Sequence, residues 1–369
     1  MAARTVVAHI GARPRRGPEG EGGAMDPTMT SRVVRTTLIV LLLTGLALLM
    51  TQMVAVWLLI FAAILIAVLI RAVADPIHRS GVPETPAVLI AVAGILALLG
   101  LVGWMFGSVL GEQFGQLAQR LPGAATDVRD WLARQPFGSG IASTTPDLQT
   151  VAGRALTFAF GAVGAITNLV LVLIGAIYLA LDPSLYVRGV ELLFPRANGP
   201  RVVAALNASG NALRKYLLGQ LFTMVFVGTL VGIGVAIVGV PSAAALGVIV
   251  GLANFVPLIG PFIGAVPGIL LAFSVSPETA LWAAVVYFIA QQVEGNVLTP
   301  IVQRYAVSIP PAVLIFALAG LGGLFGVIGV LVAAPLAVVL YTLVAMLWSR
   351  DTLGHDIGVP GQDRRAGDD

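Results

Sequence analysis

The chain has 369 residues, of which 58% are hydrophobic and 11% are charged, and its formal net charge is +3. Soluble domains carry about 25% charged residues, so this composition excludes a soluble enzyme or a soluble binding domain. Repeated apolar runs of about 20 residues instead predict an all-α polytopic membrane protein with one helical membrane body. The chain has no cysteine and only three histidines. Because these histidines lie far apart in sequence, we expect no metal site, and we expect no cofactor.

The N-terminal segment is rich in arginine, glycine and proline and lacks a hydrophobic period. It predicts a disordered cytoplasmic tail over residues 1–35, within which Met25 and Met29 are alternative starts. A second cytoplasmic tail is predicted over 351–369. Excess arginine can indicate contact with nucleic acid or lipid headgroups, but it is also the cytoplasmic signal of membrane proteins. We adopt the topological interpretation, with both termini in the cytoplasm and no nucleic-acid partner.

The predicted membrane domain covers residues 36–350 and opens with an uncharged run that is too long for one span. Two short spans joined near Thr51 and Gln52 fit a hydrocarbon core of about 30 Å better. A polar loop that starts at Arg71 then leads to a third span at 86–111. The first three spans therefore precede the longest polar interval of the chain.

Glycines recur at every fourth position of the third span, at Gly103, Gly107 and Gly111, and predict close packing against another helix. A fourth span is expected at 155–181. The interval between these spans, 112–154, has balanced charges and apolar residues at helical spacing. It predicts extracytoplasmic amphipathic helices on the membrane surface, with a small exposed domain as the alternative.

The second half of the chain is almost free of charge. Between residues 216 and 349 the charged side chains are Glu278, Glu294 and Arg304. Further spans are predicted at 216–239 and 278–299, which brings the total to about six full spans. Glu278 follows a proline at a helix start, where a carboxylate complements the helix dipole.

Two uncharged stretches, 241–273 and 312–346, contain more proline and glycine than an uninterrupted helix absorbs, since an interior proline costs about 3 kcal/mol. Both predict broken or re-entrant helical hairpins. The predicted breaks or hinges are Pro241, Pro267, Pro300 and Gly326. Irregular backbone is tolerated at membrane depth where it is buried in protein or lines a watery cavity. The alternative is a proline kink that only shapes helix packing.

The first of these hairpins predicts a substrate or ion path. The interruption would present main-chain groups and the Asn254 amide to whatever crosses, as the discontinuous helices of secondary transporters do. The predicted path residues are Asn254, Pro257, Gly260, Pro261, Gly264, Gln291, Glu294 and Asn296. We expect no catalytic residues.

Glu294 has two possible roles, one in transport and one in structure. It lies inside the predicted span 278–299, and a buried charge in a membrane is costly enough to require a reason. Glu294 could bind and release a proton, or remain ionised beside a cation. Alternatively, it could form a structural ion pair with Arg304.

Enzyme motifs are absent: the sequence contains no HExxH, no P-loop and no GxSxG nucleophile elbow. We therefore expect that the protein is not an enzyme. Without a nucleotide site, transport would have to be driven by a gradient.

Four segments together resemble the AI-2E family of transporters, the autoinducer-2 exporter or PerM-like permease family. They are "LRKYLLGQ" (213–220), "GVPSAAALGVIVGLANFVPLIGPFIGAVP" (239–267), "EGNVLTP" (294–300) and "FGVIGVLVAAPLAVVL" (325–340). The resemblance runs over about residues 36–350 and implies a homo-oligomeric protein of the bacterial inner membrane. Some members are assigned to export of the quorum-sensing molecule autoinducer-2 and others to sodium/proton antiport. Many members carry a lysine where this chain has Ile301.

The sequence leaves three functional hypotheses. The first is a gradient-driven permease that moves a small polar solute, with autoinducer-2 as one candidate, by alternating access. The second is a sodium/proton antiporter of the same family. The third is a non-transporting membrane scaffold that binds partners through 112–154. Expected partners are membrane lipid, a small polar solute or a cation such as a proton or sodium, and further copies of the chain.

Overall fold

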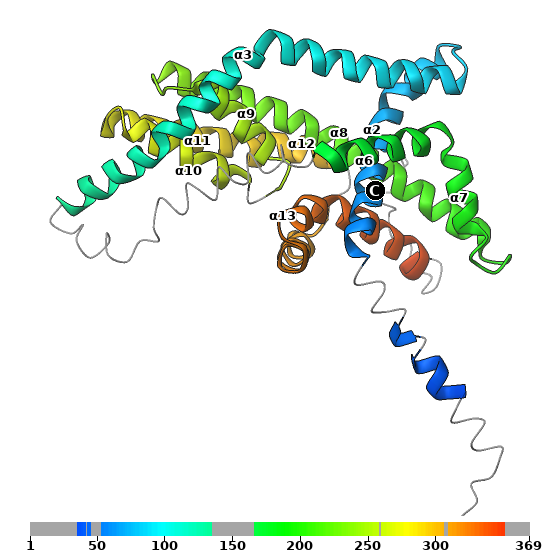
Figure 1. The fold of residues 1–369 in the computed structure, drawn as a ribbon. Coiled ribbons are helices and arrows are strands. Elements are labelled where there is room, and N and C mark those ends of the chain that lie inside the picture. Colours follow the sequence, from blue (N-terminus) through cyan, green and yellow to red (C-terminus); the bar gives the residue numbers. More distant parts are fainter. Residues whose placement is uncertain are drawn as a thin grey trace, which may run out of the picture. The chain divides into compact units, whose positions relative to one another are not determined.

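The protein is described here by a computed structural model of residues 35–41, 43–45, 53–134, 166–257, 260–305 and 309–350. The predicted tails at 1–34 and 351–369, and the predicted turn at Thr51 and Gln52, lie outside these residues. The chain divides into two units, Met1–Ala55 and Val56–Asp369. In the first unit the structure describes the short apolar helix Arg35–Gly45. Every regular element of the described residues is a helix (Figure 1).

Three helices of the second unit share one core. They are α2 (Val54–Arg79), the first half of α3 (Glu84–Ala133) and α6 (Ile166–Leu181). Small side chains such as Ala63, on α2, and Ala176, on α6, allow these helices to pack closely. The predicted polar loop from Arg71 is wrong, because α2 continues through it to Arg79 and only residues 80–83 form the turn.

Helix α3 continues well beyond the predicted span, since its 50 residues extend about 75 Å at 1.5 Å per residue. Its second half confirms the helical spacing predicted for the start of 112–154. However, Leu117, Leu121 and Ala124 are buried in a protein core shared with α8 to α11, and so do not lie on lipid. Trp131 meets Phe273 of α10 edge to face at 5.4 Å. Residues 135–154 lie outside the described residues.

The glycine face of α3 has no close neighbour among the described residues. A Cβ atom added at Gly103, Gly107 or Gly111 would meet no described atom within 4 Å. The close approach is instead between α8 (Gly199–Ile237) and α9 (Ala243–Ala253). There, a Cβ at Gly228 would lie 2.8 Å from the Gly247 carbonyl oxygen. Among the described residues, the close glycine contact therefore joins α8 to α9, and the predicted packing at Gly103, Gly107 and Gly111 stays a prediction.

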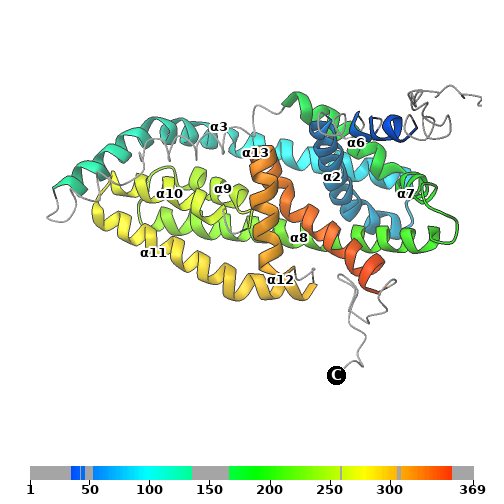
Figure 2. The ribbon, with the colours of Figure 1, turned by 90° about the horizontal axis from the view of Figure 1, so that it is seen from below.

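Helices α9 and α10 (Gly260–Phe273) form the broken segment of the predicted hairpin 241–273 (Figure 2). Pro241 lies in the turn before α9, as predicted. Pro267 lies inside α10, and the helix continues past it, so the predicted break there is wrong. A helix in a membrane tolerates an interior proline when its neighbours satisfy the freed carbonyl. The N-terminus of α9 is capped from α3, where the Gln113 Oε1 accepts from the Ala245 N–H at 3.1 Å.

A helix follows with a widened turn in its middle. Helix α11 (Pro277–Val293) is capped by Ser276, whose Oγ accepts from the Thr279 N–H at 3.0 Å. It passes into the π-helix η2 (Glu294–Leu298) and then into α12 (Thr299–Tyr305). The predicted break at Pro300 is wrong, because the wide turn before it accommodates a residue that has no N–H to donate.

The last predicted hairpin is present as a sharp break in α13 (Pro311–Val344). Gly326 has φ 61° and ψ −140°, which is not helical, and confirms the predicted break. A Cβ at Gly329 would collide with the Leu321 carbonyl, so the two arms lie against each other beyond the break. The π-helix η3 (Ala345–Arg350) follows.

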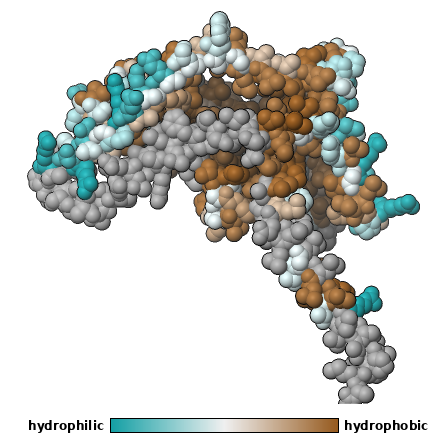
Figure 3. All heavy atoms as spheres, viewed as in Figure 1, coloured by the Kyte–Doolittle hydropathy of each residue, from teal (hydrophilic) through white to brown (hydrophobic). Residues whose placement is uncertain are grey.

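The chain is a multi-pass membrane protein by the length and composition of its helices. Among the described residues, four helices are long and apolar enough to cross a membrane, and the bent pair of α6 with α7 (Pro183–Glu191) is a fifth candidate. Hydrophobic residues cover much of the visible surface around them (Figure 3). The predicted total of six spans stays a prediction, as does the re-entrance of the two hairpins.

Candidate functional site

Asn254 lies where α9 ends and is fully buried. Its main-chain N–H donates to the Val250 carbonyl at 2.9 Å, and its main-chain carbonyl accepts from the Gln220 Nε2 at 2.5 Å. The carboxamide differs from the main chain, because neither its oxygen nor its nitrogen has a hydrogen-bond partner among the described residues. A buried polar group without a partner costs about 1 to 3 kcal/mol. Its presence at a helix end therefore requires an explanation.

The main chain around Asn254 is largely paired within its own turn. The amides of Phe255 and Val256 donate to Leu252 and Ala253, at 3.1 and 3.0 Å. Gly260, which opens α10, donates to Val256 at 2.9 Å. The sequence suggested that these main-chain amides would be free to bind a solute. They are not free, because hydrogen bonds within short turns satisfy them. Among the described residues of this interruption, the Asn254 side chain is the polar group without a partner.

Glu294 lies opposite this turn, at the first position of η2. Its carboxyl oxygen Oε2 is buried and has no hydrogen-bond partner among the described residues. The Asn254 carboxamide is close enough to interact with the Glu294 carboxyl, although the two do not form a hydrogen bond of ordinary geometry. The Glu294 main-chain carbonyl accepts from the Thr299 Oγ1 at 2.9 Å, across the wide turn. The structure thus brings together two residues that the sequence predicted for one path.

A cavity of about 170 Å³ adjoins Glu294. Its walls come from α8 to α11 and η2 and are mostly apolar, with Gln291 and Glu294 as polar lining side chains. The lining residues are Val227, Val231, Val250, Pro261, Phe262, Ala265, Tyr287, Phe288, Ala290, Gln291 and Glu294. Apolar walls with a few convergent polar groups are typical of small-molecule sites.

The remaining predicted path residues have different places. Gly264 lets α10 approach α9, because a Cβ there would lie 2.5 Å from Val250 Cγ2. Gly260 likewise fits a backbone that leaves no space for a side chain. Pro257 lies in the turn between α9 and α10 and Asn296 is exposed on η2; neither lines the cavity. Arg304 belongs to α12, but its side chain is outside the described atoms, so its ion pair with Glu294 stays a prediction.

Two contributors to this region were missed from the sequence. Gln220 binds the Asn254 carbonyl from α8, and it was visible as a lone amide in an apolar span. Tyr287 lines the cavity from α11, and its hydroxyl is buried without a partner among the described residues. Gly268 makes space for that hydroxyl, which a Cβ would strike. No local signal in the sequence pairs residues 268 and 287.

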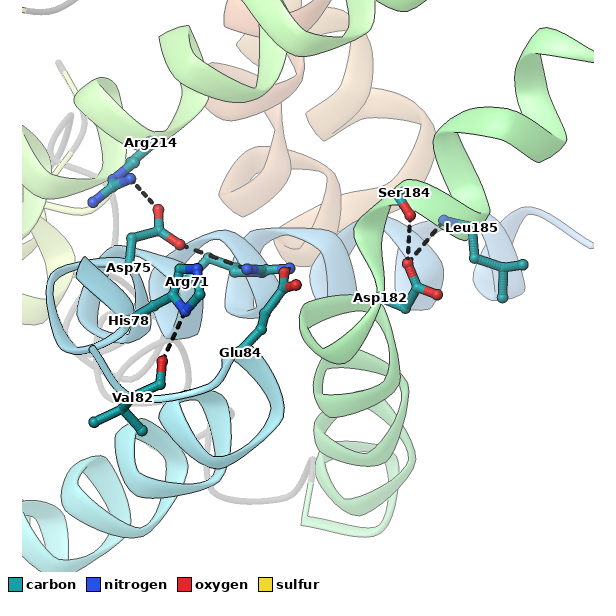
Figure 4. A network of polar contacts seen from close by, with 9 residues as sticks. All are labelled: Arg71, Asp75, His78, Val82, Glu84, Asp182, Ser184, Leu185 and Arg214. Carbon is teal, nitrogen blue, oxygen red and sulfur yellow. Dashed lines mark hydrogen bonds and ion pairs between the residues drawn. The ribbon is translucent and has the colours of Figure 1, made fainter. Parts of the chain in front are cut away.

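A second polar cluster joins α2, α3 and α8 (Figure 4). Arg214 donates to Asp75 Oδ2 at 2.5 Å and to the Ala72 carbonyl at 3.2 Å. Arg71 contacts Asp75 at 3.7 Å and Glu84 at 2.5 Å. This cluster connects three helices through side-chain ion pairs and one main-chain contact.

Comparison with known proteins matches residues 37–348 to the AI-2E family transporter. This range includes every described helix of the second unit, except for the last two residues of η3. The chain belongs to the AI-2E family. Members of this family with similar sequences include the "Putative transport protein YrrI" of Bacillus subtilis, which is 30% identical over 75% of this chain and 82% of its own length. The "Putative transport protein YueF" of the same organism is 27% identical over 75% and 81%. The "Putative permease PerM" of Escherichia coli K12 is 26% identical over 70% and 77%. The resemblance inferred from the sequence motifs is thereby confirmed.

Proposed function

We propose that this AI-2E family member is a gradient-driven secondary transporter of the bacterial inner membrane, with both termini in the cytoplasm. It moves a small polar solute or a cation by alternating access past Asn254 and Glu294. The observation that carries the proposal is the pairing of an unsatisfied buried carboxamide with an unsatisfied buried carboxyl oxygen beside a cavity.

These two groups have the chemistry that such a site requires. The amide supplies one acceptor and two donors, and the carboxylate supplies acceptors or, when protonated, one donor. Both belong to interrupted helices, since Asn254 ends α9 and Glu294 opens a π-turn. Interrupted helices provide the solute and ion sites of many secondary transporters. A solute or ion bound here would offset the cost of burying both groups unpaired.

The family name and the chemistry of the site suggest two candidate substrates. Autoinducer-2, a quorum-sensing molecule, is the candidate that the family name suggests. Sodium/proton antiport is the alternative. The buried side-chain oxygens of Glu294 and Asn254, both without a partner among the described residues, favour it, because oxygen atoms are the ligands of hard cations. In both cases Glu294 holds the species that couples to the gradient.

The scaffold hypothesis has less support. It assigned partner binding to 112–154, and the apolar face of residues 114–131 is occupied by α9, α10 and their neighbours. Transport is therefore the function we infer.

Flux into proteoliposomes tests the proposal. Purified protein should carry labelled sodium, or one member of a panel of small polar solutes, at a rate that a pH gradient changes. Glu294→Gln keeps the shape and removes the titratable group, and should reduce the initial rate at least about tenfold. Glu278→Gln is the matched control, because that carboxylate is exposed at the other end of α11. Equal rates for both variants would refute the assignment of Glu294.

A further inference from the structure

The segment after α6 exposes large apolar side chains beside arginines. This segment, residues 183–201, comprises α7, the turn that follows it and the start of α8. Leu192 and Leu193 are 84% and 81% exposed, and Leu185 and Phe194 are exposed as well. Elsewhere, exposed leucines on the apolar helices face lipid. Here they lie outside the apolar spans, where contact with water would be unfavourable.

The axis of α7 is not parallel to that of the apolar helix α6 before it. The axis turns by 83° between Val170–Leu181 and Pro183–Glu191. Asp182 fixes this corner: its Oδ1 accepts from the Ser184 hydroxyl at 2.7 Å and from the Leu185 N–H at 3.1 Å. The Ser184 hydrogen bond lowers the pKa of this exposed carboxyl, so the cap is ionised at neutral pH. If α6 crosses the bilayer, α7 runs nearly parallel to the membrane plane.

The charges of the segment are unbalanced on its exposed side. Arg188, Arg196 and Arg201 are all exposed. Arg196 and Arg201 form no ion pair among the described residues. Glu191, the acidic residue of α7, is half-buried and contacts Gly199 at the start of α8. The surface that remains open therefore combines leucines with unneutralised arginines.

We infer that residues 183–201 form an interfacial anchor for anionic phospholipid of the bilayer that the chain spans. The leucines insert at the boundary between headgroups and acyl chains, and the arginines bind the lipid phosphates. A basic amphipathic helix that lies in the membrane plane binds in this way. A bilayer explains both the exposed leucines and the unpaired arginines, and it is adjacent to the segment, because Asp182 alone separates the end of α6 from the start of α7. The anchor is independent of whether the protein transports a solute.

The depth of the segment can be measured by fluorescence, because the chain has no cysteine and a single introduced thiol labels uniquely. The full-length Leu193→Cys variant, carrying an environment-sensitive dye, is placed in nanodiscs that contain phosphatidylglycerol. Lipids with a quencher at the headgroup end of the acyl chain should quench it, whereas a dye at Val225→Cys, on the apolar part of α8, should be quenched most by lipids with the quencher deeper in the chain. Quenching only by aqueous iodide would overturn the proposal. A dye shielded from both quenchers would also overturn it and would indicate a protein neighbour instead.

The choice of lipid is tested with the arginines. Native mass spectrometry of the full chain in mixed lipid should show preferential retention of phosphatidylglycerol over phosphatidylcholine. The double variant Arg196→Gln/Arg201→Gln should lose about fivefold of that preference for each arginine. Arg120→Gln/Arg129→Gln removes the same charge from exposed positions of α3 and should leave the preference unchanged. An equal loss of lipid preference in both double variants would show that only the net charge of the protein matters, and would contradict a localised site.

Discussion

The Asp75 carboxylate, on α2, contacts the Arg214 guanidinium, on α8, at 2.5 Å (Figure 4). These residues are 139 positions apart in sequence, and Asp75 lies near the C-terminal end of α2. Their contact supports placing residues 71–85 and 182–215 on the same side of the membrane. It also ties the α2, α3 and α6 core to α8, whose later turns supply Val227 and Val231 to the cavity.

Breaking this ion pair should destabilise the protein. Both side chains are 28% exposed, so the cost should lie between that of a surface pair and that of a buried pair, at about 1 to 3 kcal/mol for Asp75→Asn. Thermal unfolding in detergent measures it. Asp127→Asn, at an exposed position of α3, serves as the control. A double-mutant cycle with Arg214→Gln should show coupling, and strictly additive losses would mean that the pair contributes nothing.

The glycine contact of α8 with α9 predicts a second stability effect. Gly228→Ala would place a methyl group 2.8 Å from the Gly247 carbonyl oxygen, and a main chain cannot move aside as a flexible side chain can. Overpacking of this kind costs about 1 to 3 kcal/mol. The unfolding temperature of Gly228→Ala should therefore fall, whereas Gly107→Ala, whose new methyl group meets no described atom, should not destabilise the chain. The reverse order would show that α3, and not α8, holds the tight helix contact.

Gly326 offers a test of backbone conformation alone. A Cβ there would meet no described atom within 4 Å, but its φ of 61° is strained for any other residue. Gly326→Ala should destabilise the chain by about 1 to 3 kcal/mol. Gly323→Ala, three residues earlier in equally open space and in helical backbone, should be neutral or slightly stabilising. If both variants unfold at the temperature of the parent, α13 does not need its break.

Features carried by local chemistry could be predicted from the sequence. Proline and glycine content located the interruption between α9 and α10 and the one at Gly326, because both residue types act on the backbone of their own segment. Asn254 and Glu294 could be singled out because a polar group in an apolar helix needs a partner. The sequence could not show that the two side chains face each other across 40 residues.

Features that depend on tertiary packing could not be predicted. The glycines of α3 and those of α8 and α9 have the same spacing, and only the contacts decide which set is packed. Pro267 and Pro300 carried the same sequence signal as Pro241, yet helix continues past both. The second half of α3 differs from a surface helix only in the α9 and α10 side chains that cover it.

Water access to Asn254 tests the central claim most directly, since a transport route must become hydrated there although the residue is fully buried in this conformation. A membrane-impermeant thiol reagent is applied to the single-cysteine variant Asn254→Cys in proteoliposomes, with Leu246→Cys, buried in the same helix, as the control. The account predicts that Asn254→Cys reacts, at a rate that an imposed sodium or proton gradient changes, while Leu246→Cys does not react. Equal protection of both positions under every gradient would contradict it.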